Sequence, residues 1–489
     1  MSTLCYAFGV RIVYASSEMA PYAKTGGLAD VSAALPKALA ARDHEVTCFL
    51  PRYGSIPFPP GRFLGSIRVP VDGLHRSASF YERELARGLR VVFVEYAPFF
   101  DRQGIYGDMN GDFGDNEFRF AFFCRAVLEY CRGRGYRPDI FHAHDWQAGL
   151  LPVYLKAFYL DDATLHRVPT VFTVHNLAYQ GHFSSATLGP LGLPESLFTE
   201  DALGWNGDIC YMKGGLLFSE IVTTVSPTYA REIQTSEFGQ GLEAVVRSRS
   251  QDLAGILNGV DYEEWDPRHD PHIASAFDES QHAGKAVCKQ ALLGEFGLAA
   301  EPDLPVIGII SRLVYQKGFD LVTAAMEPLL ARGLRMVVLG TGEPEVEAGL
   351  REFVRRDPSR FGVRFHYDAG LAHRIEAGAD MMLMPSRFEP CGLTQMYSMR
   401  YGTIPIVRAT GGLADTVQHF DLETKKGTGF VFQHADGAGL LWAIDQALAA
   451  YAKPGPWTAL RHNAMTRDFS WSRSAEQYEA VYLRAQLNA

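Results

Sequence analysis

The sequence predicts an α/β protein with two parallel-sheet domains that face each other across a deep cleft. Three observations support this prediction: strand-like runs alternate with helical patterns, 489 residues are too many for one core, and one hexapeptide occurs twice. That hexapeptide, Thr-Gly-Gly-Leu-Ala-Asp, spans 25–30 and 410–415. Each copy lies between a β-branched run and a helical pattern, where paired glycines admit a ligand and a helix N-terminus attracts anions. Chance repetition in a glycine- and alanine-rich chain is the alternative.

The first half of the chain alternates strands and helices from its start. Residues 10–16 form an apolar run, residues 28–39 carry leucine and valine at helical spacing, and 45–50 resume as a strand, which completes a βαβ unit. A helix is predicted over 118–131. Further strands are predicted at 89–95, 139–142, 169–174 and 221–225. This alternation is typical of a parallel sheet covered on both faces.

A turn-rich, aperiodic stretch over 258–270 predicts the domain boundary, which gives a first domain of 1–257 and a second of 258–489. Strands of the second domain are predicted at 305–311, 335–340, 363–367, 380–384 and 404–407. The chain ends in a helix within about 470–489. The stripe of Tyr478, Val481, Tyr482 and Gln486 on this helix could pack back on the first domain.

Composition favours an intracellular enzyme. The chain is 47% apolar and 21% charged, and its net charge of −10 argues against nonspecific nucleic-acid binding. Seven scattered cysteines without a Cys-x-x-Cys pair indicate a reducing compartment and no zinc ribbon. Residues 1–10 hold no basic leader, and no run is long enough to span a membrane, so we expect a cytoplasmic protein.

Two cations follow the first predicted strand of the second domain. Arg312 and Lys317 lie where that strand ends, which is the edge at which open α/β sheets bind ligands. Together they could hold a diphosphate and neutralise charge on a leaving group. The alternative is a solvated surface pair.

A second loop whose residues could bind a ligand spans 385–395. Glu389 lies at the end of an apolar strand, beside the amides of a predicted helix start near Leu393. The amides suit a phosphate, and the carboxylate suits sugar hydroxyls or a developing cation. The alternative is that Glu389 only caps the helix.

Histidines mark two further segments. In an extended chain, His142 and His144 would point to one side and, with Asp145, permit metal ligation, although the Glu-rich partners of most di-histidine sites are missing. The chain also lacks an Asp-x-Asp pair for a divalent ion, so we expect metal-independent chemistry. His175, at the end of another apolar run, is either a satisfied core residue or a sugar contact. A P-loop motif and a Gly-x-Gly-x-x-Gly after the first strand are both absent, which disfavours an ATPase or a dehydrogenase.

Taken together, eight segments resemble bacterial glycogen synthase and plant starch synthase in the order of that family. They are Lys24-Thr-Gly-Gly-Leu28, His142-Ala-His-Asp-Trp146, Val174-His-Asn-Leu-Ala-Tyr-Gln-Gly181, Val225-Ser-Pro-Thr-Tyr229, Asn258-Gly-Val-Asp261, Arg312-Leu-Val-Tyr-Gln-Lys-Gly318, 385–395 and 410–415. The resemblance covers nearly the whole chain. It implies the GT-B fold, with two Rossmann-like doubly wound domains. It also implies retaining transfer of glucose from ADP-glucose to the non-reducing end of an α-1,4-glucan such as glycogen, by α-1,4 linkage and without a cofactor.

The resemblance assigns roles to residues of the first domain. Lys24, Gly26 and Gly27 would meet the donor's phosphates. Asp30 and His175 would contact the glucosyl unit, and His175 would stabilise developing positive charge. Two residues resemble an acceptor-binding segment: Tyr106 and Asn116.

The remaining roles fall near or beyond the boundary. Asn258 would lie near the donor, Arg312 and Lys317 would hold the diphosphate and assist its departure, and Glu389 would orient glucose hydroxyls. The resemblance places amides that receive the sugar or phosphate at Cys391, Gly392, Leu393 and Thr394. It places the ring that stacks on adenine at Tyr367.

The sequence departs from the wider Glu-x7-Glu pattern of retaining enzymes, because Tyr397 stands eight residues after Glu389. No strong nucleophile is placed for a double displacement, so we favour departure and attack on one face, with the leaving phosphate helping to deprotonate the acceptor. The alternatives are a UDP-glucose-dependent relative, a phosphorylase, for which no pyridoxal-lysine motif is visible, and a non-catalytic glucan-binding protein. A glucan-binding protein would not need a diphosphate clamp.

Overall fold

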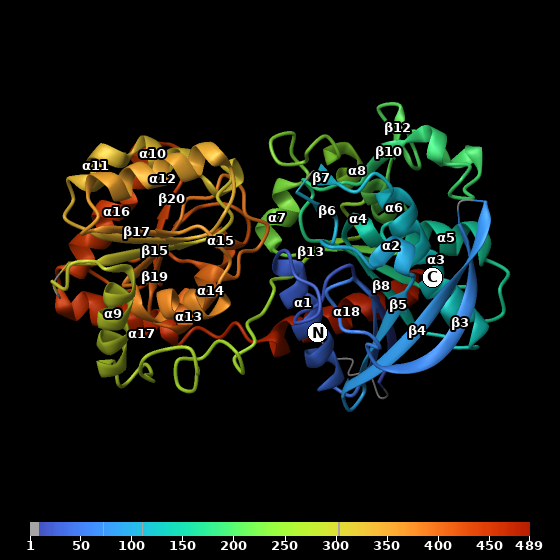
Figure 1. Ribbon diagram of the computed structural model, residues 1–489, viewed down its shortest axis with the longest axis horizontal. Coiled ribbons are helices and arrows are strands. Elements are labelled where there is room, and N and C mark those ends of the chain that lie inside the picture. The colour runs from blue at the N-terminus through green and yellow to red at the C-terminus, as the bar shows by residue number, and fades with distance from the viewer. Residues whose placement is uncertain (1–8, 72, 110, 302–303) are drawn as a thin grey trace. The chain divides into compact units, whose positions relative to one another are not determined.

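The computed structural model describes residues 9–71, 73–109, 111–301 and 304–489, and these fall into two compact units (Figure 1). Unit 1 comprises the chain up to Gly259 and again from Trp471 onward, and unit 2 is Val260–Ser470. The predicted boundary after 257 lies two residues before this division, and the terminal helix belongs to unit 1. The expectation of a leader-free start at 1–8, with Cys5, lies outside the described residues.

Unit 1 is built on a large sheet. Within its described residues, nine strands pair in the order β14-β13-β9-β8-β1-β2-β5-β4-β3, and only the β5-β4 and β4-β3 pairs are antiparallel. Numbered along the chain, the parallel strands run 3-2-1-4-5-6-7 from β5 to β14, so the order reverses between β1 and β8. The strands are β1 (Arg11–Ala15), β2 (Glu45–Pro51), β3 (Arg62–Val71), β4 (Leu74–Ala86), β5 (Leu89–Glu95), β8 (Ile140–His144), β9 (Thr170–Val174), β13 (Ile221–Thr224) and β14 (Leu253–Gly255).

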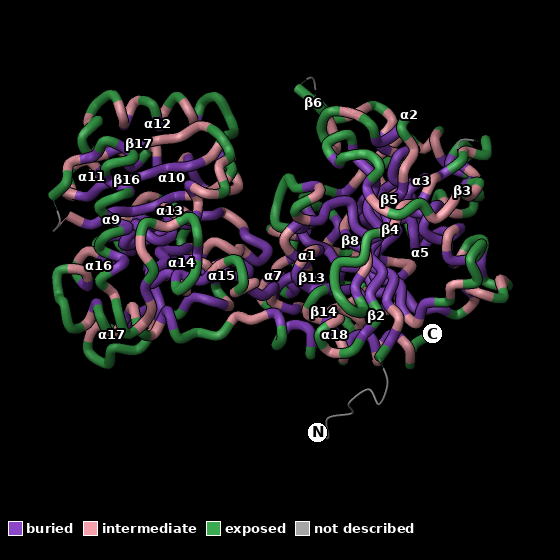
Figure 2. The backbone as a smooth tube through the Cα atoms, turned by 60° about the horizontal axis from the view of Figure 1, so that its bottom comes forward, coloured by how far each residue is buried: buried purple, intermediate pink, exposed green. Residues whose placement is uncertain are grey.

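Helices cover this sheet, and every residue of its central strands β8 and β9 is buried (Figure 2). Burial on both faces explains why these strands read as continuous apolar or small runs rather than as alternating ones. The helices of unit 1 are α1 (Gly27–Ala40), α2 (Ala97–Phe100), α3 (Asn116–Gly133), α4 (Asp145–Ala148), α5 (Leu150–Phe158), α6 (Tyr211–Phe218), α7 (Pro227–Glu232), α8 (Glu243–Ser248) and α18 (Trp471–Asn488). Short antiparallel strands complete the unit: β6 (Gly107–Asp108), β7 (Gly111–Asp112), β10 (His182–Ser184), β11 (Gly204–Trp205) and β12 (Asp208–Cys210).

Unit 2 carries a parallel sheet with the order of a nucleotide-binding domain. Its described strands pair in the order β17-β16-β15-β18-β19-β20, which is 3-2-1-4-5-6 along the chain, with the reversal between β15 and β18. In Figure 1, helices α10, α11 and α12 lie over one face of the sheet, and α13, α14 and α17 lie over the other. The strands are β15 (Val306–Ile310), β16 (Arg335–Leu339), β17 (Phe361–Arg364), β18 (Met381–Met384), β19 (Ile404–Arg408) and β20 (Phe430–Phe432). The helices are α9 (Ala283–Phe296), α10 (Phe319–Ala324), α11 (Met326–Leu330), α12 (Pro344–Arg356), α13 (Ala369–Gly378), α14 (Thr394–Arg400), α15 (Gly411–Thr416), α16 (Gly437–Tyr451) and α17 (Pro454–Met465).

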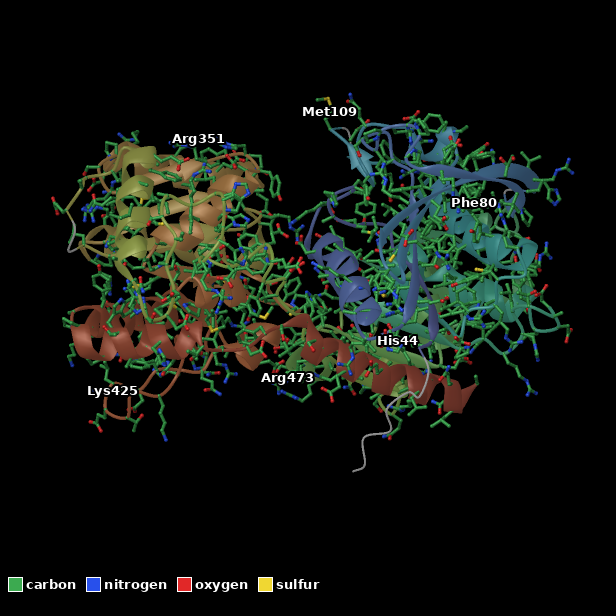
Figure 3. All side chains as sticks on the ribbon, turned by 90° about the horizontal axis from the view of Figure 1, so that it is seen from below. His44, Phe80, Met109, Arg351, Lys425 and Arg473 are labelled. Carbon is green, nitrogen blue, oxygen red and sulfur yellow. The ribbon has the colours of Figure 1, made fainter. Side chains whose placement is uncertain are left out.

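The terminal helix α18 is fixed to unit 1 by polar contacts along its length. Ser474 Oγ donates to the Leu257 carbonyl at 2.6 Å. Glu479 Oε1 lies 3.0 Å from Nε2 of His44, which Figure 3 shows beside the helix. Further along, the Tyr482 hydroxyl lies 2.9 Å from His142 Nδ1 in β8. The last helix therefore covers the first sheet, as its apolar stripe allowed.

The prediction of two Rossmann-like doubly wound domains is confirmed. One strand was placed wrongly, since β17 ends at Arg364 and Tyr367 lies beyond it. The antiparallel pair β3 and β4 was not predicted. Strand β3 contains Gly65 and Pro70, which are typical of edge strands and bulges and weaken a strand signal. No helix in the described part of the chain is both long and apolar enough to cross a membrane.

Candidate active site

The strongest candidate site in unit 2 lies where its strand order reverses. The loops after β15 and β18 carry the predicted residues Lys317 and Glu389, and Lys317 Nζ donates to Glu389 Oε2 at 2.5 Å. Ser386 Oγ donates to the same oxygen at 3.1 Å. Glu389 is only 5% exposed, so its charge is stabilised by these two donors rather than by bulk water. In doubly wound folds, ligands bind at this edge of the sheet.

The two loops are held to each other by their backbones. Gly318 has φ +72°, and a Cβ there would lie 2.1 Å from the Pro385 carbonyl oxygen, so only glycine allows this approach. The Arg387 amide donates to the Gln316 carbonyl at 2.8 Å, and Gln316 Nε2 donates to the Phe388 carbonyl at 3.3 Å. Gln316 therefore ties the lysine loop to the glutamate loop.

Gln316 also contacts the other predicted cation of this site. Arg312 Nη2 lies 3.4 Å from Gln316 Oε1, and the arginine side chain is exposed. The structure therefore brings together the three chemically active side chains predicted in this unit: Arg312, Lys317 and Glu389.

Free amides adjoin the carboxylate. The backbone N–H groups of Gly392, Leu393 and Thr394 make no hydrogen bond to any described residue. Gln395 Nε2 donates to the carbonyls of Cys391 and Gly392 at 3.0 and 3.1 Å, which fixes the opposite side of these peptides. Three consecutive donors at the start of α14 can receive hydroxyls or an anion.

The tyrosine at the second position of the Glu-x7-Glu pattern has a packing role. The Tyr397 ring stacks on Trp265 with centroids 4.0 Å apart and an interplanar angle of 2°, and His373 stacks on the other side of Trp265 at 3.8 Å. The ring therefore anchors α14 to the segment that opens unit 2. Tyr367, the predicted adenine-stacking residue, is 75% exposed in the loop after β17.

In unit 1, the Lys24 loop is organised by a residue that the sequence analysis missed. Glu18 is buried, and its two carboxylate oxygens accept from the Thr25 amide and hydroxyl, both at 2.6 Å, and from the Gly26 amide at 3.2 Å. Lys24 Nζ is paired with Asp30 Oδ1 at 2.6 Å, and burial raises the pKa of Asp30. Gly26 and Gly27 are exposed at the start of α1, and a Cβ on Gly26 would meet nothing within 4 Å.

The two predicted acceptor-binding residues belong to the same network. The Tyr106 hydroxyl donates to Glu18 Oε1 at 2.7 Å, and Asn116 Nδ2 donates to the Tyr106 carbonyl at 2.9 Å. Asn116 is buried at the start of α3, so here it supports the tyrosine backbone. The nearby β6–β7 turn carries Met109, which is 97% exposed and projects from the unit in Figure 3. The convergent donors that mark Glu18 are visible only in the folded chain, so its role left no signal in the sequence.

His175 follows β9 at the same edge of the first sheet. Its backbone amide donates to Asp145 Oδ1 at 2.7 Å, and its Nε2 lies 3.0 Å from His144 Nδ1. Burial lowers the pKa of His175 to about 3, so the imidazole is neutral near pH 7. Burial also raises the pKa of Asp145 to about 7.

The metal interpretation of this segment finds no support in the donor set. Both ring nitrogens of His142 are engaged, by Tyr482 and by Thr173 Oγ1 at 2.7 Å. Among the described residues, no group of three His, Cys, Asp or Glu side chains is arranged to hold an ion. Asn258, the predicted donor contact before the division, is buried, and its Oδ1 has no hydrogen-bond partner in the described chain.

Comparison with known proteins identifies both halves of the chain. Residues 11–248 match the starch synthase catalytic domain model, and 295–458 match the model for glycosyl transferases group 1. The chain is 49% identical to the glycogen synthase of Anaeromyxobacter sp. (strain Fw109-5), over 97% of this chain and 99% of that protein. It is 45% identical to the glycogen synthase of Myxococcus xanthus (strain DK1622), over 97% and 99%.

Solved structures agree with this result. The catalytic domain of starch synthase IV from Arabidopsis thaliana, bound to ADP and acarbose, matches with a TM-score of 0.91 and 38% identity, over 98% of this chain and 100% of that one. Sucrose-phosphate synthase from Thermosynechococcus elongatus matches with a TM-score of 0.60 and 18% identity, over 96% and 98%, which shows a shared fold.

Proposed function

Because this chain belongs to the glycogen and starch synthase family of glycosyltransferases, we propose that it transfers glucose from ADP-glucose to the non-reducing end of an α-1,4-glucan. The transfer retains the anomeric configuration and extends the chain by α-1,4 linkages. The observation that carries the proposal is the Lys317–Glu389 pair at the switch point of unit 2, next to three free amides. The ADP and acarbose bound to the related starch synthase IV support the same donor and acceptor classes.

We assign the diphosphate to the two cations of unit 2. The Lys317 ammonium has three N–H groups and gives one to Glu389, which leaves two for phosphate oxygens. Arg312 supplies a second cation from the same loop. As the bond between the anomeric carbon and the phosphate oxygen breaks, its electron pair goes to ADP, and these cations stabilise that charge. Their charge makes a metal ion unnecessary in this proposal.

We assign the glucosyl unit to Glu389 and the amides of 392–394. A buried carboxylate already fixed by two donors can accept hydroxyl protons of glucose in a defined orientation. Tyr397 is a phenol rather than a second carboxylate, and its ring is held in the Trp265 stack. The acceptor hydroxyl therefore attacks the anomeric carbon from the face that ADP leaves, and its proton passes to a phosphate oxygen of ADP.

Residues of unit 1 complete the proposed machinery. Lys24, Gly26 and Gly27 meet the donor's phosphates from a loop that Glu18 holds open to solvent. His175 contacts the sugar as a neutral ring, and a neutral imidazole does not repel the positive charge that develops there.

The same proposal extends to Asp30, Asn258, Tyr367 and Tyr106 as substrate contacts, and to Asn116, which acts by holding the Tyr106 backbone. We place the enzyme in the cytoplasm, and the six described cysteines, all buried and none in a disulfide, support a reducing compartment.

The test incubates the purified full chain with glycogen and either ADP-glucose or UDP-glucose, in the presence of EDTA. We expect release of ADP and lengthening of outer chains, with the new anomeric protons in the α configuration by NMR. Faster turnover with UDP-glucose would overturn the donor assignment. Absence of glucan extension with either donor would overturn the proposed function.

A further inference from the structure

Three histidines meet at the carboxyl ends of β8 and β9, and the proposed function uses only His175. His142 and His144 have ring centroids 4.0 Å apart, and His144 and His175 are 5.3 Å apart. His142 is satisfied by Tyr482 and Thr173. His144 is fully buried, and its ring makes one contact of hydrogen-bond length to the described residues, from its Nδ1 to His175 Nε2 at 3.0 Å.

One hydrogen lies between the two nitrogens of this contact. Burial lowers the pKa of both rings well below the ordinary range, so both are neutral near pH 7. A neutral imidazole carries its proton on only one nitrogen, and the shared contact therefore links the tautomers of the two rings. Either His144 Nδ1–H donates and His175 is protonated on Nδ1, or His175 Nε2–H donates and His144 is protonated on Nε2.

The surroundings of His144 decide between these arrangements. His144 Nε2 is buried and has no hydrogen-bond partner in the described part of the chain. A proton there would be a buried donor without an acceptor, and such orphaned donors are rarer than under-satisfied acceptors. The geometry therefore favours the arrangement in which His144 Nδ1–H donates to His175.

His144 is also rigid enough to impose its tautomer. Its ring stacks on Tyr14 with centroids 4.0 Å apart and an interplanar angle of 29°. The next residue, Asp145, has φ +55°, an uncommon conformation outside glycine, and accepts from the His175 amide. This turn directs two successive side chains at the same residue, one at its ring and one at its backbone.

We propose that His144 is a positioning residue that holds His175 in the Nδ1–H tautomer, so that His175 presents a neutral N–H donor to an oxygen of the substrate. His175 Nδ1 has no hydrogen-bond partner among the described residues, which leaves that group available. The role in catalysis rests on the proposed function, whereas the tautomer itself does not.

The first test reads the tautomer directly, by two-dimensional ¹⁵N–¹H NMR of the full chain labelled at histidine. His175 signals are identified by their loss in the H175Q variant. We expect a protonated Nδ1 and an unprotonated Nε2 at His175, and a mixture of tautomers in H144F. Tyr482→Phe, which removes the hydroxyl from the neighbouring His142, is the control and should leave the His175 signals unchanged. A protonated Nε2 in the wild type, or an unchanged spectrum in H144F, would overturn the proposal even if the protein has no transferase activity.

The second test separates hydrogen bonding from ring packing. His144→Asn places an amide donor near the position of Nδ1 but loses the ring, whereas His144→Phe keeps the ring and loses the donor. We expect His144→Phe to lower kcat about tenfold, equal to about 1.4 kcal/mol, with little change in KM for ADP-glucose, and His144→Asn to retain most of the turnover. In an H175A background, His144→Phe should have little further effect, since its action passes through His175. The opposite ranking of the two variants, or full additivity with H175A, would assign His144 to packing alone.

Discussion

The second copy of the repeated hexapeptide offers the sharpest test of how the glutamate loop is held in place. Gly411 has φ +43°, and a Cβ there would lie 1.9 Å from the Glu389 carbonyl oxygen. The adjacent Gly412 amide lies 3.2 Å from the same oxygen. Gly411→Ala therefore cannot be accommodated unless the peptide that carries Glu389 moves away from α15.

Two costs set the size of the effect. A non-glycine residue in the left-handed region costs roughly 1–2 kcal/mol. For a unit of this size, that lowers the thermal midpoint of unfolding by roughly 2–8 °C. The clash adds to this cost, since relieving a contact of 1.9 Å requires a shift of at least about 1 Å. A displacement of about 1 Å at a reacting group can lower turnover on the order of 100-fold.

Gly26→Ala in the first copy is the matched control. Gly26 has φ −159°, and a Cβ at this position would lie in open space. The thermal midpoint of unfolding of the Gly26→Ala protein should therefore equal or slightly exceed that of the wild type. Because we propose that this glycine meets the donor's phosphates, the Gly26→Ala enzyme should have a raised KM for ADP-glucose. Calorimetry and initial rates with varied ADP-glucose measure both effects. A Gly411→Ala protein with wild-type midpoint and kcat would refute the reasoning.

Three further predictions concern the charge, packing and titration of the site. Lys317→Ala should lower kcat by a factor on the order of 10²–10³, as for loss of an oxyanion donor. Lys426→Ala, on the exposed 421–427 loop, is the control and should leave kcat unchanged. Initial rates at saturating ADP-glucose measure both values. Tyr397→Phe should preserve the Trp265 stack and activity, and Tyr397→Glu should lower the thermal midpoint without raising turnover. Between pH 6.5 and about 4, the unfolded chain binds protons that folded His142, His144 and His175 do not, so these histidines make unfolding easier as pH falls. Folded Asp145 binds a proton that the unfolded chain does not, so it opposes this trend, and the three histidines together outweigh it. Urea titrations of H175Q across this range should show a slope shallower by about 1.4 kcal/mol per pH unit, and an unchanged slope would contradict a neutral His175.

The sequence carried most of the information about the parallel sheets and little about their edges. Buried parallel strands such as Val306–Ile310 leave a short apolar run, and its alternation with helical patterns predicts a parallel sheet covered on both faces. The doubly wound class itself was implied by the family resemblance. The antiparallel strands β3 and β4 are half exposed, and β3 is also interrupted by Gly65 and Pro70, so their hydrophobic signal is weak. The β17 prediction extended to Tyr367 because an aromatic residue suits a strand, although here it lies in solvent.

The candidate site was predictable where chemistry and position coincide along the chain. Arg312, Lys317 and Glu389 follow buried strands directly, and the rule for the carboxyl ends of parallel strands places them together. Glu18 was missed because its function depends on donors from Thr25 and Tyr106, and the second of these is far away in the chain. His144 was considered only as a metal ligand, since periodicity shows that two histidines share a face but not what they contact.

The two identical hexapeptides show why an equal sequence does not imply an equal role. In the first copy, the glycines begin α1 in open space and the carboxylate of Glu18 holds the preceding peptide, which leaves the loop surface exposed. In the second copy, Gly411 and Gly412 are in contact with the backbone of 389–391, which occupies the space that a Cβ would need. Glycine serves both situations because each needs a backbone without a Cβ, one for a ligand and one for a neighbouring loop. The first copy is therefore the binding surface that we propose for the donor, and the second determines where Glu389 stands.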